Sequence, residues 1–151
     1  MKQLILATLL TGAIMLCEPS AVAQSAPPPK PLVRLGTVVI KKGVMLDGGK
    51  QLRAGTYDVR LTRQESKPST GTIPGVERQA EFVRRSFYRR GMVAGTAVVN
   101  VFPASDVSKI QDQEGNVPKS GTQTVEITPH DFLRIWFNKN ETHYLIYLRS
   151  S

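Results

Sequence analysis

Short runs of β-branched and aromatic residues, separated by glycine, proline, asparagine or aspartate, constrain this chain more than any other feature. From Leu32 onward the runs recur about every 8 to 15 residues, which is typical of an all-β domain. Outside the N-terminal segment, no stretch of about ten residues has the 3.6-residue periodicity of an amphipathic helix. The pattern therefore excludes folds built mainly from helices.

The runs mark eight candidate strands. Their expected ranges are 33–40, 43–49, 57–62, 80–83, 93–102, 124–127, 132–137 and 143–148. Alternation in 57–62 places Tyr57, Val59 and Leu61 on one buried face, and the polar segment 138–141 suits a hairpin loop. About 120 residues are enough for one core and too few for two ordinary domains. We therefore predict an all-β fold, a single-domain antiparallel β-sandwich of about seven or eight strands, with a small β-barrel as the alternative.

Three segments interrupt the strand pattern. Ser105 is placed to cap a short helix or turn over 105–110. The polar segments 64–75 and 111–121 are longer than hairpins need. We expect these two segments to be mobile or functional.

The candidate strand 132–137 is apolar on both of its faces. Leu133, Ile135 and Phe137 share one face, which we expect in the core, while Phe132 and Trp136 lie on the other. A strand of this kind lies centrally in a core or covers a second surface. The face with Phe132 and Trp136 is either a binding platform or packed beneath the long loops.

The first 23 residues have the organisation of a secretory signal peptide. A charged start precedes an apolar run over 4–16, and residues 21–23 have the small-x-small pattern that signal peptidase recognises. The run is shorter than the roughly 20 apolar residues of a transmembrane helix. We predict cleavage near Ala23 and a periplasmic or secreted protein that begins near Gln24.

Cys17 is the only cysteine of the chain and falls within the predicted signal peptide, so the exported protein would contain no disulfide. A lipidated cysteine normally follows a small residue, whereas Leu16 precedes Cys17, which argues against a lipoprotein. Residues 24–31 contain four prolines and are expected to form an extended leader. The predicted β-sandwich domain then spans 32–151.

Residues 49–60 read Gly-Lys-Gln-Leu-Arg-Ala-Gly-Thr-Tyr-Asp-Val-Arg. This segment resembles the Leu-x-x-Gly-x-Tyr-x-Val hairpin of secreted prealbumin-like and carboxypeptidase-regulatory-like β-sandwiches. It is also similar to small exported bacterial proteins of unknown function that carry Ala-Gly-Thr-Tyr-x-Val-Arg. In such a hairpin Gly55 turns the chain, and Tyr57 and Val59 enter the core. The resemblance covers about a dozen residues of 151; it implies a secreted sandwich, and no activity or site residue.

One seven-residue segment carries the strongest chemical signal, because four guanidinium groups flank two aromatic rings. The candidate ligand-binding residues are Arg84, Arg85, Phe87, Tyr88, Arg89 and Arg90. Arginine binds phosphate, sulfate or carboxylate groups with two parallel hydrogen bonds, and the rings can stack on sugars or bases. The alternative is a turn between two strands, with solvated arginines and one ring folded back onto the core.

A second set of basic residues surrounds the first predicted turn. It consists of Lys41, Lys42, Lys50 and Arg53, with Lys30 and Arg34 nearby. The predicted signal peptide contains one residue of each charge, so its removal leaves the net charge at +8. If the two basic sets joined, their field would attract lipid headgroups, acidic glycans or extracellular nucleic acid; if dispersed, they would only promote solubility.

Catalytic and metal-binding patterns are weak throughout the chain. There is no Gly-x-Ser-x-Gly nucleophile motif, and the two histidines, His130 and His143, are too few for a typical zinc site. We expect no catalytic residues, no metal and no cofactor.

These observations together predict an exported, non-catalytic binding module for an anionic envelope or extracellular ligand. The expected partners are an anionic glycan, a lipid headgroup or an envelope protein; nucleic acid is less favoured but stays open. The alternative is a structural or assembly accessory protein that binds a larger envelope protein complex through a sheet edge.

Overall fold

The computed structural model describes residues 33–86 and 91–151. The predicted signal peptide (1–23) and leader (24–31) lie outside the described residues. In the part of the chain that is described, no helix has both the length and the apolar character needed to cross a bilayer.

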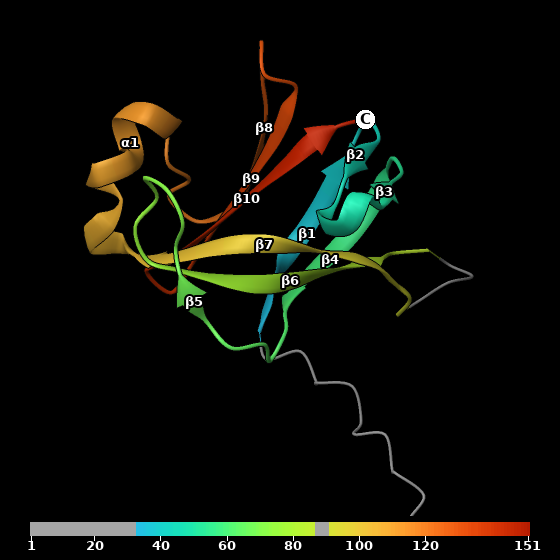
Figure 1. Cartoon of the computed structure of the whole chain (residues 1–151), viewed down its shortest axis with the longest axis horizontal. Coiled ribbons are helices and arrows are strands. Elements are labelled where there is room, and N and C mark those ends of the chain that lie inside the picture. The colour runs from blue at the N-terminus through green and yellow to red at the C-terminus, as the bar shows by residue number, and fades with distance from the viewer. Residues whose placement is uncertain (1–32, 87–90) are drawn as a thin grey trace, which may run out of the picture.

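Antiparallel strands make up most of the described structure (Figure 1). The seven long strands are β1 (Arg34–Ile40), β4 (Gly55–Leu61), β6 (Val76–Arg84), β7 (Val93–Pro103), β8 (Gly121–Ile127), β9 (Phe132–Lys139) and β10 (Thr142–Ser150). Three strands have two residues each: β2 (Val44–Met45), β3 (Gln51–Leu52) and β5 (Lys67–Pro68). The helical elements are η1 (Asp47–Gly49), η2 (Ala104–Asp106) and α1 (Ser108–Glu114).

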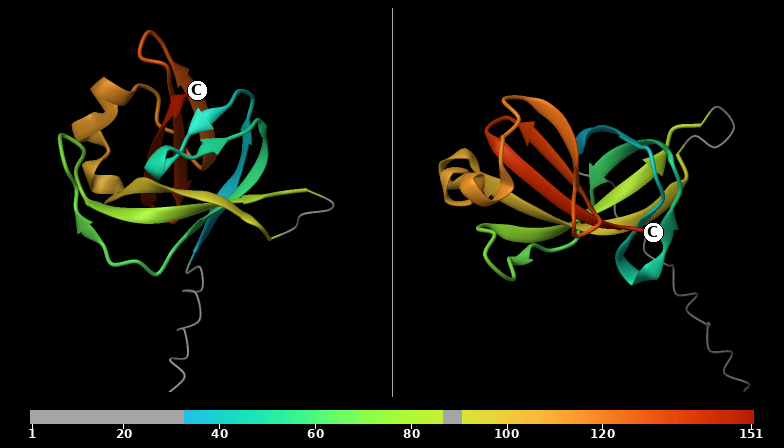
Figure 2. Two further views of the ribbon diagram at one scale, coloured as in Figure 1. Left: turned by 45° about the vertical axis from the view of Figure 1, so that its right-hand side comes forward. Right: turned by 90° about the horizontal axis from the view of Figure 1, so that it is seen from above.

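The strands form one sheet that folds over on itself as an all-β sandwich (Figure 2). The long strands follow the order β1-β4-β6-β7-β10-β9-β8, and every neighbouring pair is antiparallel. The sheet is not closed, so the barrel alternative is not formed. Its two edge strands, β1 and β8, nevertheless lie close together: a Cβ built on Gly36 would be 2.8 Å from Oγ1 of Thr122.

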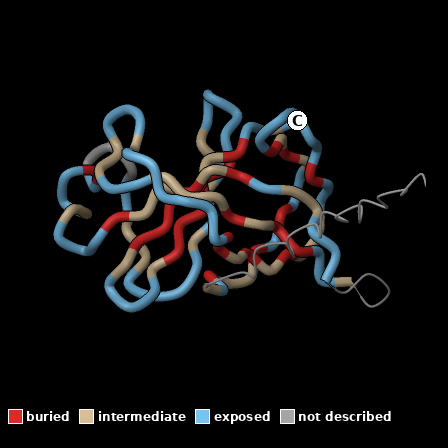
Figure 3. The backbone as a smooth tube through the Cα atoms, turned by 60° about the horizontal axis from the view of Figure 1, so that its bottom comes forward, coloured by how far each residue is buried: buried red, intermediate tan, exposed pale blue. Residues whose placement is uncertain are grey.

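The main core lies between the two halves of the folded sheet, where buried residues gather along the strands (Figure 3). Tyr57, Val59 and Leu61 of β4 are at most 1% exposed, as their alternation predicts. Leu133, Ile135 and Phe137 of β9 also belong to this core. Burial of these large apolar side chains is the main source of stability, because about 1.5–3 kcal/mol accompanies each fully buried side chain.

A second, smaller core lies beneath α1. Its buried residues are Phe102, Ile110, Trp136 and Leu145, and partly buried Ile73, Val107, Val117 and Tyr147 pack against them. Trp136 is fully buried. The face of β9 that carries Trp136 is therefore covered rather than available as a binding platform. Phe132, on the same face, is 37% exposed.

The predicted short helix is present, although its boundaries differ. Helical turns extend over η2 and α1 and so continue into the expected loop 111–121, and no side chain caps the start of either element. The final hairpin is tighter than the predicted four-residue loop, because only Asn140 and Glu141 separate β9 from β10. Both residues have positive φ (51° and 59°), as a two-residue turn between twisted strands requires.

Candidate functional site

The arginine segment lies where β6 ends. Arg84 donates its backbone N–H to the carbonyl of Met92 (3.2 Å), and Arg85 donates its own to the carbonyl of Thr56 (2.9 Å). Both backbones are thus fixed by neighbouring segments, while both side chains are exposed. Phe87, Tyr88, Arg89 and Arg90, the other predicted ligand-binding residues, lie outside the described residues.

Arg84 and Arg85 line a surface cavity of about 490 Å³, which we call the arginine cavity. Its lining consists of Asp58, Arg60, Val83, Arg84, Arg85, Ser86 and Gly91. Three guanidinium groups and one carboxylate thus belong to the same hollow. The volume lies within the usual range for small-ligand sites, about 300–1,000 Å³.

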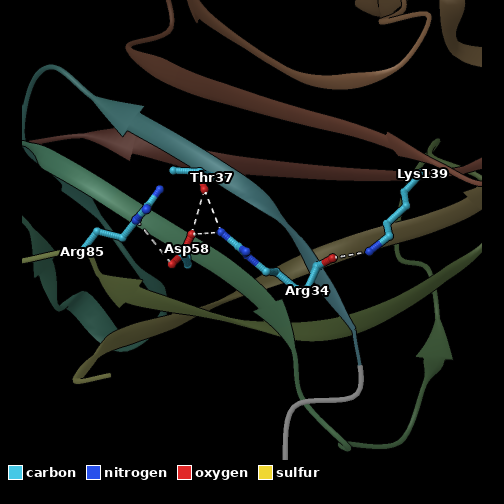
Figure 4. A network of polar contacts seen from close by, with 5 residues as sticks. All are labelled: Arg34, Thr37, Asp58, Arg85 and Lys139. Atoms are coloured by element: carbon cyan, nitrogen blue, oxygen red, sulfur yellow. Dashed lines mark hydrogen bonds and ion pairs between the residues drawn. The ribbon is translucent and has the colours of Figure 1, made fainter. Parts of the chain in front are cut away.

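Asp58, in the lining of this cavity, contacts the cationic side chains of Arg34 and Arg85 (Figure 4). Thr37 lies directly opposite Asp58 on β1 and donates its hydroxyl hydrogen to Oδ1 at 2.7 Å. Arg34 donates to the same oxygen at 2.6 Å and to the Thr37 hydroxyl at 3.2 Å. Nε of Arg85 lies 3.7 Å from Oδ2. One carboxylate therefore contacts two arginines from different parts of the chain, Arg34 in β1 and Arg85 just after β6.

The carboxyl group of Asp58 is ionised at neutral pH. Burial by itself raises its pKa, but hydrogen bonds from Thr37 and Arg34 and the charges of Arg34 and Arg85 outweigh that effect. The pKa consequently lies below its ordinary value of 3.8. Arg34 and Asp58 form a close ion pair, which leaves Arg60, Arg84 and Arg85 as an excess of positive charge.

Arg34 is itself anchored at the start of β1. Lys139, from the end of β9, donates its ammonium group to the carbonyl oxygen of Arg34 at 2.7 Å. This contact adds a third cation, after Arg34 and Arg85, to the network (Figure 4). Lys139 thus extends the network from Arg34 to the end of β9.

The two basic sets of the sequence are joined only in part. Arg34 meets Arg85 through Asp58, whereas Lys41 and Lys42 line a different cavity, of about 750 Å³, between β1 and β8. The arginine cavity is also lined by Asp58 and Arg60, which lie outside the charged segment 84–90 of the sequence. Asp58 and Arg60 alternate with Tyr57 and Val59, which places them on the outer face of β4. This alternation is the sequence signal that identifies them as surface residues.

No family model, curated protein or solved structure matches this chain. The resemblance of 49–60 to prealbumin-like and carboxypeptidase-regulatory-like sandwiches therefore stays a prediction. In the structure Tyr57 and Val59 of this segment are buried in the core. The segment does not form the expected hairpin, because β3 pairs with β2 whereas β4 pairs with β1 and β6.

The positions of the two histidines bear on the question of a metal site. In the described ranges 33–86 and 91–151, no group of three or more histidine, cysteine, aspartate or glutamate side chains is placed to hold an ion. His143 is 3% exposed and lies in the interior, whereas His130 is exposed in the turn between β8 and β9.

Proposed function

We propose that the protein is an exported, non-catalytic binding module whose arginine cavity holds an anionic group of an envelope or extracellular ligand. The observation that carries the proposal is the convergence of Arg60, Arg84 and Arg85 on one hollow of about 490 Å³. Guanidinium groups form paired hydrogen bonds to planar or tetrahedral oxyanions. Export rests on the signal-peptide pattern of the first 23 residues.

The internal charge balance supports an anion rather than a cation as the ligand. Asp58 already accepts hydrogen bonds from Thr37 and Arg34, so its negative charge is satisfied within the protein. Arg85 approaches Asp58 only at 3.7 Å, beyond ordinary hydrogen-bond length. Its guanidinium donors are therefore well placed to turn toward a phosphate, sulfate or carboxylate.

The same chemistry supports a binding role in preference to hydrolysis. Asp58 is the only carboxylate among the described residues that line the cavity, and its lowered pKa makes it a poor proton acceptor at neutral pH. Hydrogen bonds to arginine further occupy its lone pairs. A phosphorylated lipid headgroup and a sulfated or carboxylated glycan share the oxyanion that the arginines recognise.

Binding of a sulfated glycan and of lipid vesicles tests the proposal. The full chain is titrated with heparin and with vesicles that contain or lack phosphatidylglycerol, at low and high salt. We expect binding to the anionic probes that weakens with salt and falls about tenfold or more in R84A/R85A, a loss of about 1.4 kcal/mol. Which probe binds identifies the source of the oxyanion.

The matched control removes two exposed arginines outside the cavity. R53A/R63A has the same net charge as R84A/R85A, and Arg53 and Arg63 are both exposed. We expect this variant to bind nearly as well as the wild type. Equal loss in the two double variants would show that overall charge alone drives binding, and absence of binding to every probe would contradict the proposal.

A further inference from the structure

A second cavity, larger than the arginine cavity, lies where the sheet fails to close. It measures about 750 Å³, and residues on its two sides come from the end of β1 with β2 and from β8 with the start of β9. Toward the other end of these strands, β1 and β8 come together, because Gly36 leaves no space for a side chain beside Thr122. The cavity is thus a wedge between two sheet edges, which we call the strand groove.

The edge of β1 directs backbone hydrogen-bonding groups into this groove. The carbonyl of Thr56 accepts from Arg85, so the backbone groups of Thr56 face β6. Val39 lies opposite Thr56 in the ladder, and opposite residues in an antiparallel pair either exchange both hydrogen bonds or none. The N–H and C=O of Val39 therefore point away from β4, toward the groove.

The edge of β8 does the same from the other side. The two-residue turn at 140–141 makes Lys139 and Thr142 a hydrogen-bonded pair. Backbone groups alternate sides along a strand, so every second residue from Lys139 back to Leu133 faces β10. The residues between them, including Arg134, face β8, and Arg134 bonds to Val125, its partner in the register. The backbone groups of Thr124 and Glu126 consequently point away from β9.

The strand directions fit one added strand. Six successive antiparallel pairings lead from β1 to β8, so β1 and β8 run in the same direction. A strand placed between them and antiparallel to one is antiparallel to both. It would hydrogen-bond to two edges at once, whereas ordinary strand addition uses one edge.

We propose that the strand groove binds an extended segment of an acidic partner protein, which runs antiparallel to β1 and β8. The segment pairs with Val39 on one side and with Thr124 and Glu126 on the other. This interface does not depend on the arginine cavity, which lies on the outer face of β4 and β6.

The chain's own leader does not suit the groove. Residues 24–31 contain four prolines, and proline lacks the N–H that a strand between two edges must donate. A second copy of the chain brings the same leader and a net charge of +8, which opposes association.

The net charge of the chain, +8, favours an acidic segment over a basic one, while the groove itself holds charges of both signs, Lys41 and Lys42 with Glu126 and Asp131. Lys42 and Glu126 form an ion pair across the opening at 3.8 Å, and their side chains are 77% and 52% exposed. Such a pair contributes little, about 0–1 kcal/mol. An acidic side chain of the partner can therefore replace Glu126 beside Lys42.

A peptide tethered to the C-terminus tests the proposal with a defined probe. Ser150 and Ser151 line the groove, and β10 runs parallel to β1 by the same count of pairings. A peptide of about seven residues, alternating Val with Glu, is joined to Ser151 by a flexible Gly/Ser linker of about eight residues. A strand that turns back from Ser151 runs antiparallel to β10, and therefore antiparallel to β1 and β8, as the proposal requires.

Hydrogen exchange of individual amides reports whether the peptide occupies the groove. We expect exchange at Val39, Thr124 and Glu126 to slow about tenfold or more. A tether with proline at every second position should leave these rates unchanged, and one with Lys in place of Glu should slow them less. Unchanged rates with the Val/Glu tether would overturn the proposal, and equal slowing with the Lys tether would overturn the acidic partner.

A variant of the β1 edge provides an independent check. V39P removes an N–H that β4 does not use, and proline is tolerated on an edge strand for that reason. Tethered V39P should retain the unfolding transition of the untethered chain and lose part of the protection at Thr124. If the untethered wild type dimerises in sedimentation experiments and protects the same amides, the occupant is a second copy and the proposal is wrong.

Discussion

Nε1 of Trp136 donates a hydrogen bond of 3.0 Å to Nδ1 of His143 inside the smaller core. Phe102 stacks on the imidazole, with ring centroids 5.6 Å apart and planes 14° from parallel. Because Nδ1 accepts the indole hydrogen, the imidazole is neutral and carries its proton on Nε2. A buried histidine in this position couples the packing beneath α1 to pH.

We predict that acid weakens the fold through His143. Burial lowers the pKa of His143 from its ordinary value of 6.5, so the unfolded chain takes up a proton at a higher pH than the folded one. The free energy of unfolding should therefore fall as the pH drops below about 6.5 and level off below the lowered pKa. Urea unfolding monitored by Trp136, the only tryptophan, at about pH 5 and pH 7.5 measures this.

Two glutamine variants separate the histidines. H143Q keeps an acceptor for the indole N–H and removes the titration, so its stability should depend less on pH in this range. H130Q changes the exposed histidine and should keep the wild-type dependence. If H143Q retains the full dependence, another group causes it.

The alternation of apolar residues predicts a strand well where one of its faces is buried. It predicts a strand poorly where few of the strand's residues are buried. Tyr57–Val59–Leu61 identifies β4 because each side chain reaches the core. In contrast, β8 contains no fully buried residue, so its first half reads as a polar loop. The sequence pattern does not predict the start of β6 either, because Glu77 and Gln79 are only partly buried.

The candidate site could be predicted only in part, because strand order decides it. Arg84 and Arg85 stand out through local density of charge. Asp58 lies 24 positions from Arg34, and only the β1–β4 register brings the two together. The residue pattern of a single strand does not predict which strand it pairs with or in which register.

We predict that the Asp58 network stabilises the fold modestly. D58N removes the charge that accepts from Thr37 and Arg34, and should lower the free energy of unfolding by about 1 kcal/mol at neutral pH. The lowered pKa of Asp58 means that its contribution is present above the unfolded pKa and is lost as the pH falls through the folded value. The difference between wild type and D58N should therefore shrink below about pH 4.

Glu126 offers the matched control for this change. Its pair with Lys42 is longer, at 3.8 Å, and exposed on both sides, so E126Q should alter stability by less than about 0.5 kcal/mol. Denaturant titration of both variants measures the contrast. An equal effect of D58N and E126Q would mean that the Asp58 hydrogen bonds add nothing beyond surface charge.

We predict that a side chain at Gly75 lowers the stability of the fold for a steric reason. Gly71 and Gly75 have nearly the same φ, 98° and 99°, so alanine meets the same backbone strain at each. A Cβ at Gly75 would lie 2.1 Å from the carbonyl oxygen of Val101, whereas one at Gly71 meets no atom within 4 Å. G75A should cost about 2 kcal/mol more than G71A, measured by thermal or urea unfolding; equal costs would contradict the close packing of 75 against β7.

We predict that Ile110 holds α1 on the sheet. α1 has seven residues, too few for a helix that is stable alone, and Ile110 of α1 is buried in the smaller core together with Trp136. I110A should therefore cost about 2–4 kcal/mol and shift the Trp136 fluorescence to longer wavelength, because water gains access to the indole. V93A, at a site 47% exposed, should change stability by less than about 0.5 kcal/mol. If I110A leaves both stability and emission unchanged, α1 does not depend on this contact and the smaller core is held by the sheet alone.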